Sequence, residues 1–135
     1  MAFTLGSKFI LKLIKTDSSV YDYKVIKYEL LTENIRLSGS EKYFELKPEK
    51  ETIEIIFAVG YNNEGKDEKD FKTVLLLRNN YANTITYNAE IKIWNKENFQ
   101  KTSTEPLNPG TRNKELWPYK IDNIALLNFK ELIKP

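Results

Sequence analysis

The chain has 135 residues, of which 41% are hydrophobic and 30% charged, and its formal net charge is +2. This size and balance predict a single globular domain over residues 1–135 with one hydrophobic core. The 21 basic and 19 acidic residues are spread along the chain, whereas phosphate binding needs basic residues gathered on one face. We therefore expect no nucleic-acid partner.

The sequence contains neither cysteine nor histidine. The first absence excludes disulfides and thiolate metal sites, and the second removes the commonest general base and metal ligand. We therefore predict no metal centre, no cofactor and no enzymatic activity.

No apolar run approaches the roughly 20 residues that span a bilayer, so we expect a soluble chain without a transmembrane segment. Residues 1–7 lack the charged and apolar regions of a signal peptide. Because a leader can be removed before this point, the compartment stays open. The abundance of Lys, Asn, Ile and Tyr favours a bacterial source.

Three segments in the first half of the chain alternate in the manner of β-strands, namely residues 8–15, 20–31 and 52–60. A short helix also fits residues 8–15, but their isoleucines and phenylalanine favour a strand. Residues 32–39 predict a loop with a short strand near 35–37, and residues 43–46 predict a brief strand that ends before Pro48.

The clearest pattern lies in residues 71–94, FKTVLLLRNNYANTITYNAEIKIW. Residues 73–78 are apolar on both faces, which predicts a strand inside a sheet. Residues 84–93 alternate, with Ile91 on the inward face and Lys92 on the outward one. The asparagine-rich turn at 79–83 predicts that the two strands form a hairpin. The polar residues 61–70 predict an antiparallel connection from 52–60 to this unit.

Prolines break residues 95–119, which predicts a long loop across the outside of the sheet with a short edge strand near 99–103. Residues 122–133 fit either a closing strand or a helix. We favour a strand with Ala125, Leu127 and Phe129 inward.

Short strands separated by polar turns predict an all-β, antiparallel β-sandwich of the immunoglobulin-like kind. The stretch VLLLRNNYANTITYNAEI, residues 74–91, resembles the middle hairpin of immunoglobulin-like modules in architecture. The cysteine and tryptophan marks of antibody domains are missing, because the chain has no cysteine.

Carboxylate pairs are the broadest catalytic option, since glycoside hydrolysis needs no histidine. The candidate pairs are Glu41 with Glu45, Glu49 with Glu51, and Glu105 with Glu115. Neighbouring lysines favour an ordinary charged surface instead. The oxygen-rich loop at 62–70 carries Asn62, Glu64, Asp67 and Asp70, yet its lysines and irregular spacing fit calcium poorly.

Aromatic side chains are the remaining functional signal, because exposed ones bind sugars or proteins. The candidate binding residues are Trp94, Trp117 and Tyr119. Alternation places Trp94 outward, although the size of the side chain favours burial at the end of the sandwich. We expect Trp117 to pin the long loop to the core.

These patterns favour a non-enzymatic structural or protein-interaction module, associated with bacterial secretion or the cell envelope, whose partner is another protein or a second copy of the chain. One alternative is a carbohydrate-binding module that uses exposed aromatics. The other is a histidine-free glycosidase.

Overall fold

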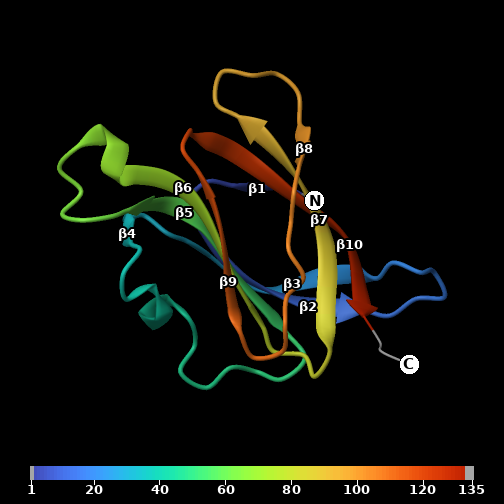
Figure 1. Ribbon diagram of the computed structural model, residues 1–135. Helices are drawn as coiled ribbons and strands as arrows, with labels where there is room; N and C mark the ends of the chain where they lie inside the picture. Colours follow the sequence, from blue (N-terminus) through green and yellow to red (C-terminus); the bar gives the residue numbers. More distant parts are fainter. Residues whose placement is uncertain (1, 133–135) are drawn as a thin grey trace.

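The computed structural model describes residues 2–132, and within them two packed sheets form an antiparallel β-sandwich (Figure 1). The four-stranded sheet has the order β1 (Ala2–Thr4), β10 (Ile121–Leu132), β7 (Thr84–Ile93), β8 (Gln100–Thr102). The six-stranded sheet has the order β3 (Asp22–Leu30), β2 (Ser7–Ile14), β5 (Ile53–Tyr61), β6 (Phe71–Asn79), β9 (Arg112–Trp117), and β4 (Ile35–Arg36) runs parallel to β5. The predicted all-β sandwich is confirmed.

The main core lies between the two sheets and is built by alternation along each strand. The inward residues of β5 and β6 meet those of β7 and β10. Its largest fully buried side chains include Phe9, Leu11, Ile53, Ile55, Phe57, Leu75, Leu77, Ile85, Ile91 and Phe129. The predicted inward face of residues 84–93 is therefore correct.

A second core covers the outer face of the six-stranded sheet, which explains why β5 and β6 are apolar on both faces. The segment between β3 and β5, which carries β4 and the 3-10 helix η1 (Ser40–Tyr43), lies over this face (Figure 1). Ile35 and Phe44 of this segment pack on Ile56, Ala58, Val74 and Leu76. A Cβ at Gly60 would lie 2.8 Å from Leu37 Cδ2 and 3.0 Å from Val74 Cγ1, so glycine lets this segment pack closely here without displacing either side chain.

A buried ion pair fastens the covering segment to the sheet. The Glu54 carboxylate accepts hydrogen bonds from Arg78 Nε at 2.5 Å and from the backbone N–H of Glu45 at 2.8 Å. Arg78 also donates to the Glu45 carbonyl oxygen at 2.7 Å, and its guanidinium lies 5.1 Å from the centre of the Phe44 ring. The backbone of Glu45 is thus hydrogen-bonded to side chains of two neighbouring strands, Glu54 of β5 and Arg78 of β6. These bonds order a segment that has little regular structure of its own.

The predicted hairpin between residues 73–78 and 84–93 is wrong, because β6 and β7 belong to different sheets. Both edges of β6 are already occupied by β5 and β9, so β7 has no free edge of β6 to pair with. The antiparallel pair of β5 and β6 is confirmed.

The side chain of the buried Asn79 holds the connection that crosses between the sheets. Its amide nitrogen donates to the carbonyl oxygens of Asn83 at 2.9 Å and Leu107 at 2.8 Å. Its amide oxygen accepts the backbone N–H of Tyr81 at 2.8 Å. Residues 79–83 have no positive φ, so asparagine serves here through side-chain hydrogen bonds and not through left-handed backbone.

Most other predicted strands are present, and the exceptions have local causes. The predicted strands at 8–15, 20–31, 35–37, 52–60 and 99–103 correspond to β2, β3, β4, β5 and β8, with bounds that agree to within two residues. The brief strand predicted at 43–46 is wrong, because η1 ends at Tyr43 and the residues after it continue the covering segment without pairing to a sheet. The long loop at 95–119 is interrupted by β9, which pairs with β6 and was not predicted.

The closing strand β10 confirms the strand prediction for residues 122–133, of which Ile133 lies outside the described residues. Its predicted inward face is correct only at Phe129. Ile124 and Leu126 are buried, while Ala125 and Leu127 are half-buried. A register shift at Asn128, whose φ is 57°, turns Phe129 back into the core. No helix among residues 2–132 has the length and apolarity to cross a membrane.

Candidate functional site

Exposed aromatic side chains mark one end of the sandwich. Trp94 follows β7 and is 58% exposed, and Tyr119 in the turn between β9 and β10 is 42% exposed. The backbone N–H of Trp94 donates to the carbonyl oxygen of Lys120 at 2.9 Å, which brings the two segments together. The outward position that alternation indicates for Trp94 is the one observed, and the burial that the size of its ring favours is wrong, because the outward phase continues past the end of β7 at Ile93. We call this region the aromatic end.

Trp117 does not belong to this exposed surface. It is 7% exposed, lies at the end of β9 and packs in the main core. Its indole N–H donates to Thr102 Oγ1 at 3.3 Å. It is pinned to the core, as predicted, although from a strand and not from a loop. The three predicted contact residues therefore do not form one surface.

A small charged group adjoins the aromatic end. The Asp122 carboxylate lies 4.0 Å from the amines of both Lys92 and Lys120. These ion pairs are long and partly exposed, so they contribute little to stability. They place one carboxylate and two ammonium groups next to the backbone to which Trp94 is attached.

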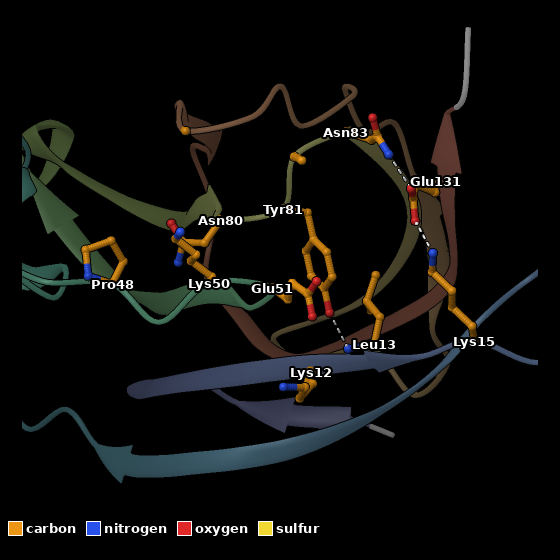
Figure 2. Close-up of a pocket in the computed structure, with 12 residues that line it drawn as sticks. Lys12, Leu13, Lys15, Pro48, Lys50, Glu51, Asn80, Tyr81, Asn83 and Glu131 are labelled. Carbon is orange, nitrogen blue, oxygen red and sulfur yellow. Dashed lines mark hydrogen bonds and ion pairs between the residues drawn. The ribbon is translucent and has the colours of Figure 1, made fainter. Parts of the chain in front are cut away.

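A groove of about 880 Å³ lies at the opposite end of the sandwich, where the connection from β6 to β7 begins (Figure 2). It is formed by the end of β2, the segment before β5, the β6 to β7 connection, the turn before β9 and the end of β10. The lining residues are Lys12, Leu13, Lys15, Pro48, Lys50, Glu51, Asn80, Tyr81, Ala82, Asn83, Gly110 and Glu131. We call it the Tyr81 groove.

Tyr81 stands in the middle of this groove (Figure 2). Its hydroxyl oxygen accepts the backbone N–H of Leu13 at 2.8 Å, so the hydroxyl hydrogen stays free to donate. Partial burial raises the pKa of Tyr81, and the hydrogen bond from Leu13 offsets only part of this effect. The group is thus a neutral donor at physiological pH.

The acidic groups on the walls of the groove differ in how far they are neutralised. Glu131 accepts a hydrogen bond from Asn83 Nδ2 and lies 3.2 Å from Lys15 Nζ. The Asn83 hydrogen bond, followed by that from Lys15, lowers the pKa of Glu131 and keeps it ionised. Glu51 is exposed and has a φ of 59°, with its backbone N–H bonded to the carbonyl oxygen of Asn80.

Of the predicted carboxylate pairs, Glu105 and Glu115 lie close enough to influence each other. Burial first, and then Glu105, raises the pKa of Glu115 on β9. The Tyr87 hydroxyl nearby is buried without a hydrogen-bond partner, and burial strongly raises its pKa. Glu45 instead pairs with Lys27 at 2.9 Å, which lowers the Glu45 pKa.

The acidic loop at 62–70 uses its oxygen atoms to hold its own backbone. The Asp70 carboxylate accepts the Asp67 backbone N–H and the Asn63 amide, each at 3.2 Å, and so caps the 3-10 helix η2 (Glu68–Asp70). The Asp67 hydrogen bond is the main reason why the Asp70 pKa is lowered. Within residues 2–132, no three acidic side chains come close enough together to hold a metal ion.

The Tyr81 groove was missed from the sequence because its walls come from five distant segments. A local signal existed in a tyrosine at the centre of an asparagine-rich connection, NNYAN. Comparison of the chain with protein-family models, with curated proteins and with solved structures found no match.

Proposed function

We propose that the chain is a non-enzymatic, immunoglobulin-like β-sandwich that acts as a protein-interaction module through its aromatic end. The observation that carries this proposal is the 58% exposure of Trp94, next to the segment that carries the exposed Tyr119. Trp and Tyr are the side chains that dominate binding energy at protein interfaces. A partner at this interface would bury the Trp94 ring, which the fold of its own domain leaves exposed.

Two further observations support this function. Strands that follow one another along the chain cross between two antiparallel sheets, as β6 and β7 do, which fits the immunoglobulin-like class. In the Tyr81 groove, Glu131 is engaged by Asn83 and Lys15, which disfavours it as a general acid. We propose a bacterial source from the composition, and a secreted or envelope setting because β-sandwiches commonly present loops and edges to partners.

Comparison of Trp94→Ala with Leu46→Ala tests this function, because Leu46 is also exposed, at 99%, and follows Glu45, which is bonded to Arg78 near the opposite end of β6. Each variant is used as bait in an extract of the source cells, and its self-association is measured by light scattering across concentrations. We expect wild type and Leu46→Ala to retain the same partner or oligomer, and Trp94→Ala to lose at least about tenfold in affinity. A strict monomer whose captured proteins do not depend on Trp94 contradicts the proposal.

Carbohydrate binding at the same end is the second candidate. Asp122, flanked by Lys92 and Lys120, offers hydrogen-bonding groups beside the exposed Trp94, the combination that fits a sugar ring and its hydroxyls. A glycan array probed with wild type, Trp94→Ala and Leu46→Ala discriminates the two functions. Glycan binding that disappears only in Trp94→Ala favours the carbohydrate module.

A further inference from the structure

We propose that the Tyr81 groove binds an acidic peptide segment of a partner, at a second site independent of the aromatic end. The two sites lie at opposite ends of β6. Thr73 near its start donates to the carbonyl oxygen of Tyr119, and Asn79 at its end begins the connection that carries Tyr81. The groove can therefore be occupied without contact with Trp94.

The charge of the groove favours an anionic ligand. Three lysines and two glutamates line it, and Glu131 already has Asn83 and Lys15 as partners. Within residues 2–132, Lys12 and Lys50 have no acidic group within ion-pair distance. A bound carboxylate would supply the counter-charge that these two ammonium groups lack.

The pairing of β2 with β3 strengthens this argument. Lys12 lies directly opposite Lys24 in the β2 to β3 register, and Lys24 also lacks an acidic partner within the described residues. Like charges placed opposite each other in a sheet are destabilising. The chain thus keeps an unfavourable pair at the rim of the Tyr81 groove, and an anionic ligand would relieve it.

The shape and chemistry of the groove favour a peptide over a single phosphate group. Its volume of about 880 Å³ lies within the range of sites that hold extended ligands. Its lining combines lysines with the apolar side chains of Leu13, Pro48 and Ala82 and the free hydroxyl hydrogen of Tyr81. It has no arginine in its lining, and phosphate sites typically use arginine forks or helix N-termini. Alternating carboxylate and small apolar side chains match this surface.

Fluorescence polarisation with two labelled peptides tests the proposal. In one peptide glutamate alternates with alanine, and in the other glutamine replaces each glutamate. The proteins are wild type, the double variant Lys12→Gln/Lys50→Gln, and Lys96→Gln, a matched control whose exposed lysine follows the aromatic end. We expect the glutamate peptide to bind at least about tenfold more tightly than the glutamine peptide, with affinity falling as salt rises.

The double variant should lose most of this preference, whereas Lys96→Gln should keep it, with unchanged circular dichroism in both. Equal binding of the two peptides, absence of binding, or tighter binding of an oligogalacturonate than of the glutamate peptide each overturns the proposal. Trp94→Ala should bind the glutamate peptide as wild type does. Failure at the Tyr81 groove therefore leaves the function proposed for the aromatic end standing, and the reverse is also true.

Discussion

Trp117 of the six-stranded sheet donates its indole N–H to Thr102 Oγ1 of the four-stranded sheet across a distance of 3.3 Å. The two residues belong to β9 and β8, which are edge strands of their sheets. Further along β9, Asn113 Nδ2 donates to the carbonyl oxygen of Pro106 at 3.3 Å. Side chains of β9 thus fasten the segment that follows β8 and close one open side of the sandwich.

Replacing Trp117 separates the packing of the ring from its hydrogen bond. Trp117→Phe should cost about 1 to 2 kcal/mol of unfolding free energy, and Trp117→Ala about 3 to 5, because the ring fills the core. Urea denaturation followed by circular dichroism measures both. Trp94→Ala serves as the control and should cost under about 0.5 kcal/mol, since its ring is exposed. Equal losses at the two tryptophans would falsify the assignment of their burial.

The Glu115 carboxyl, on β9 at the same side of the sandwich, makes the stability of the folded protein depend on pH. Its pKa is raised in the folded protein by burial and by Glu105, so the folded state holds the proton more tightly than the unfolded state does. The contribution of Glu115 is thus most favourable below its unfolded pKa of about 4.3, and is lost as pH rises through the higher folded pKa. Glu115→Gln should therefore raise the melting temperature at pH 7 more than at pH 4.

The exposed Glu97 supplies the comparison for this measurement through Glu97→Gln. The lowered pKa values of Glu45, Asp70 and Glu131 act in the opposite direction, because their stabilisation is lost as pH falls. The informative quantity is the difference between each variant and wild type at a given pH. A Glu115→Gln shift that does not vary with pH refutes the argument.

Alternation along the chain was sufficient to predict most strands, but it carries no information on which strands pair. The apolar run 73–78 correctly indicated a strand inside a sheet, because only such a strand is covered on both faces. The hairpin failed because neighbours along the chain were taken as neighbours in space, while β9, from 112–117, occupies the edge of β6. The alternation in β9 is weak because its outward residues Lys114 and Leu116 differ in polarity.

The two candidate sites differ in how far the sequence could reveal them. The outward position of Trp94 followed from its place in the alternation, and only the general tendency of tryptophan to be buried argued against it. The Tyr81 groove depends on contacts such as the hydrogen bond between Leu13 and Tyr81, which lie 68 positions apart. A pattern of alternation within a short stretch of sequence carries no information about a contact between residues so far apart.

We expect that removing one partner of the ion pair between Glu54 and Arg78 strongly destabilises the folded protein. The side chains of Glu54 and Arg78 are 5% and 16% exposed. Arg78→Met leaves the Glu54 carboxylate buried without its charged partner, so we expect a loss of about 3 to 5 kcal/mol in denaturant melts. The double variant Glu54→Leu/Arg78→Met should recover part of this loss. A smaller loss in Arg78→Met than in the double variant contradicts this account.

Packing on the two sides of the six-stranded sheet can be compared directly. Leu76 lies in the second core, on the outer face of the six-stranded sheet, and Ile91 lies in the main core between the sheets. Both side chains are almost fully buried. Truncation of either to Ala should cost about 2 to 5 kcal/mol, whereas Lys92→Ala should cost under about 0.5. Thermal and urea unfolding measure all three. A negligible loss at Leu76 would mean that the covering segment does not pack on β6.

Asn79 links the fold to the Tyr81 groove, because its side chain makes three hydrogen bonds inside the connection that carries Tyr81. Asn79→Ala removes all three hydrogen bonds and leaves the Tyr81 N–H without this acceptor, while the Leu107 carbonyl oxygen keeps its bond from the Ile85 N–H, so we expect a cost of about 1 to 3 kcal/mol. Asn79→Asp keeps the acceptor for the Tyr81 N–H but places a carboxylate against the Asn83 and Leu107 carbonyl oxygens. We therefore expect it to be no more stable than Asn79→Ala at pH 7 and to gain relative to it as pH falls, when protonation restores one donor. Denaturant melts at pH 4 and pH 7 measure the stability of both variants. If Asn79→Asp is as stable as wild type at pH 7, the hydrogen bond from the Tyr81 N–H is sufficient by itself to hold the connection.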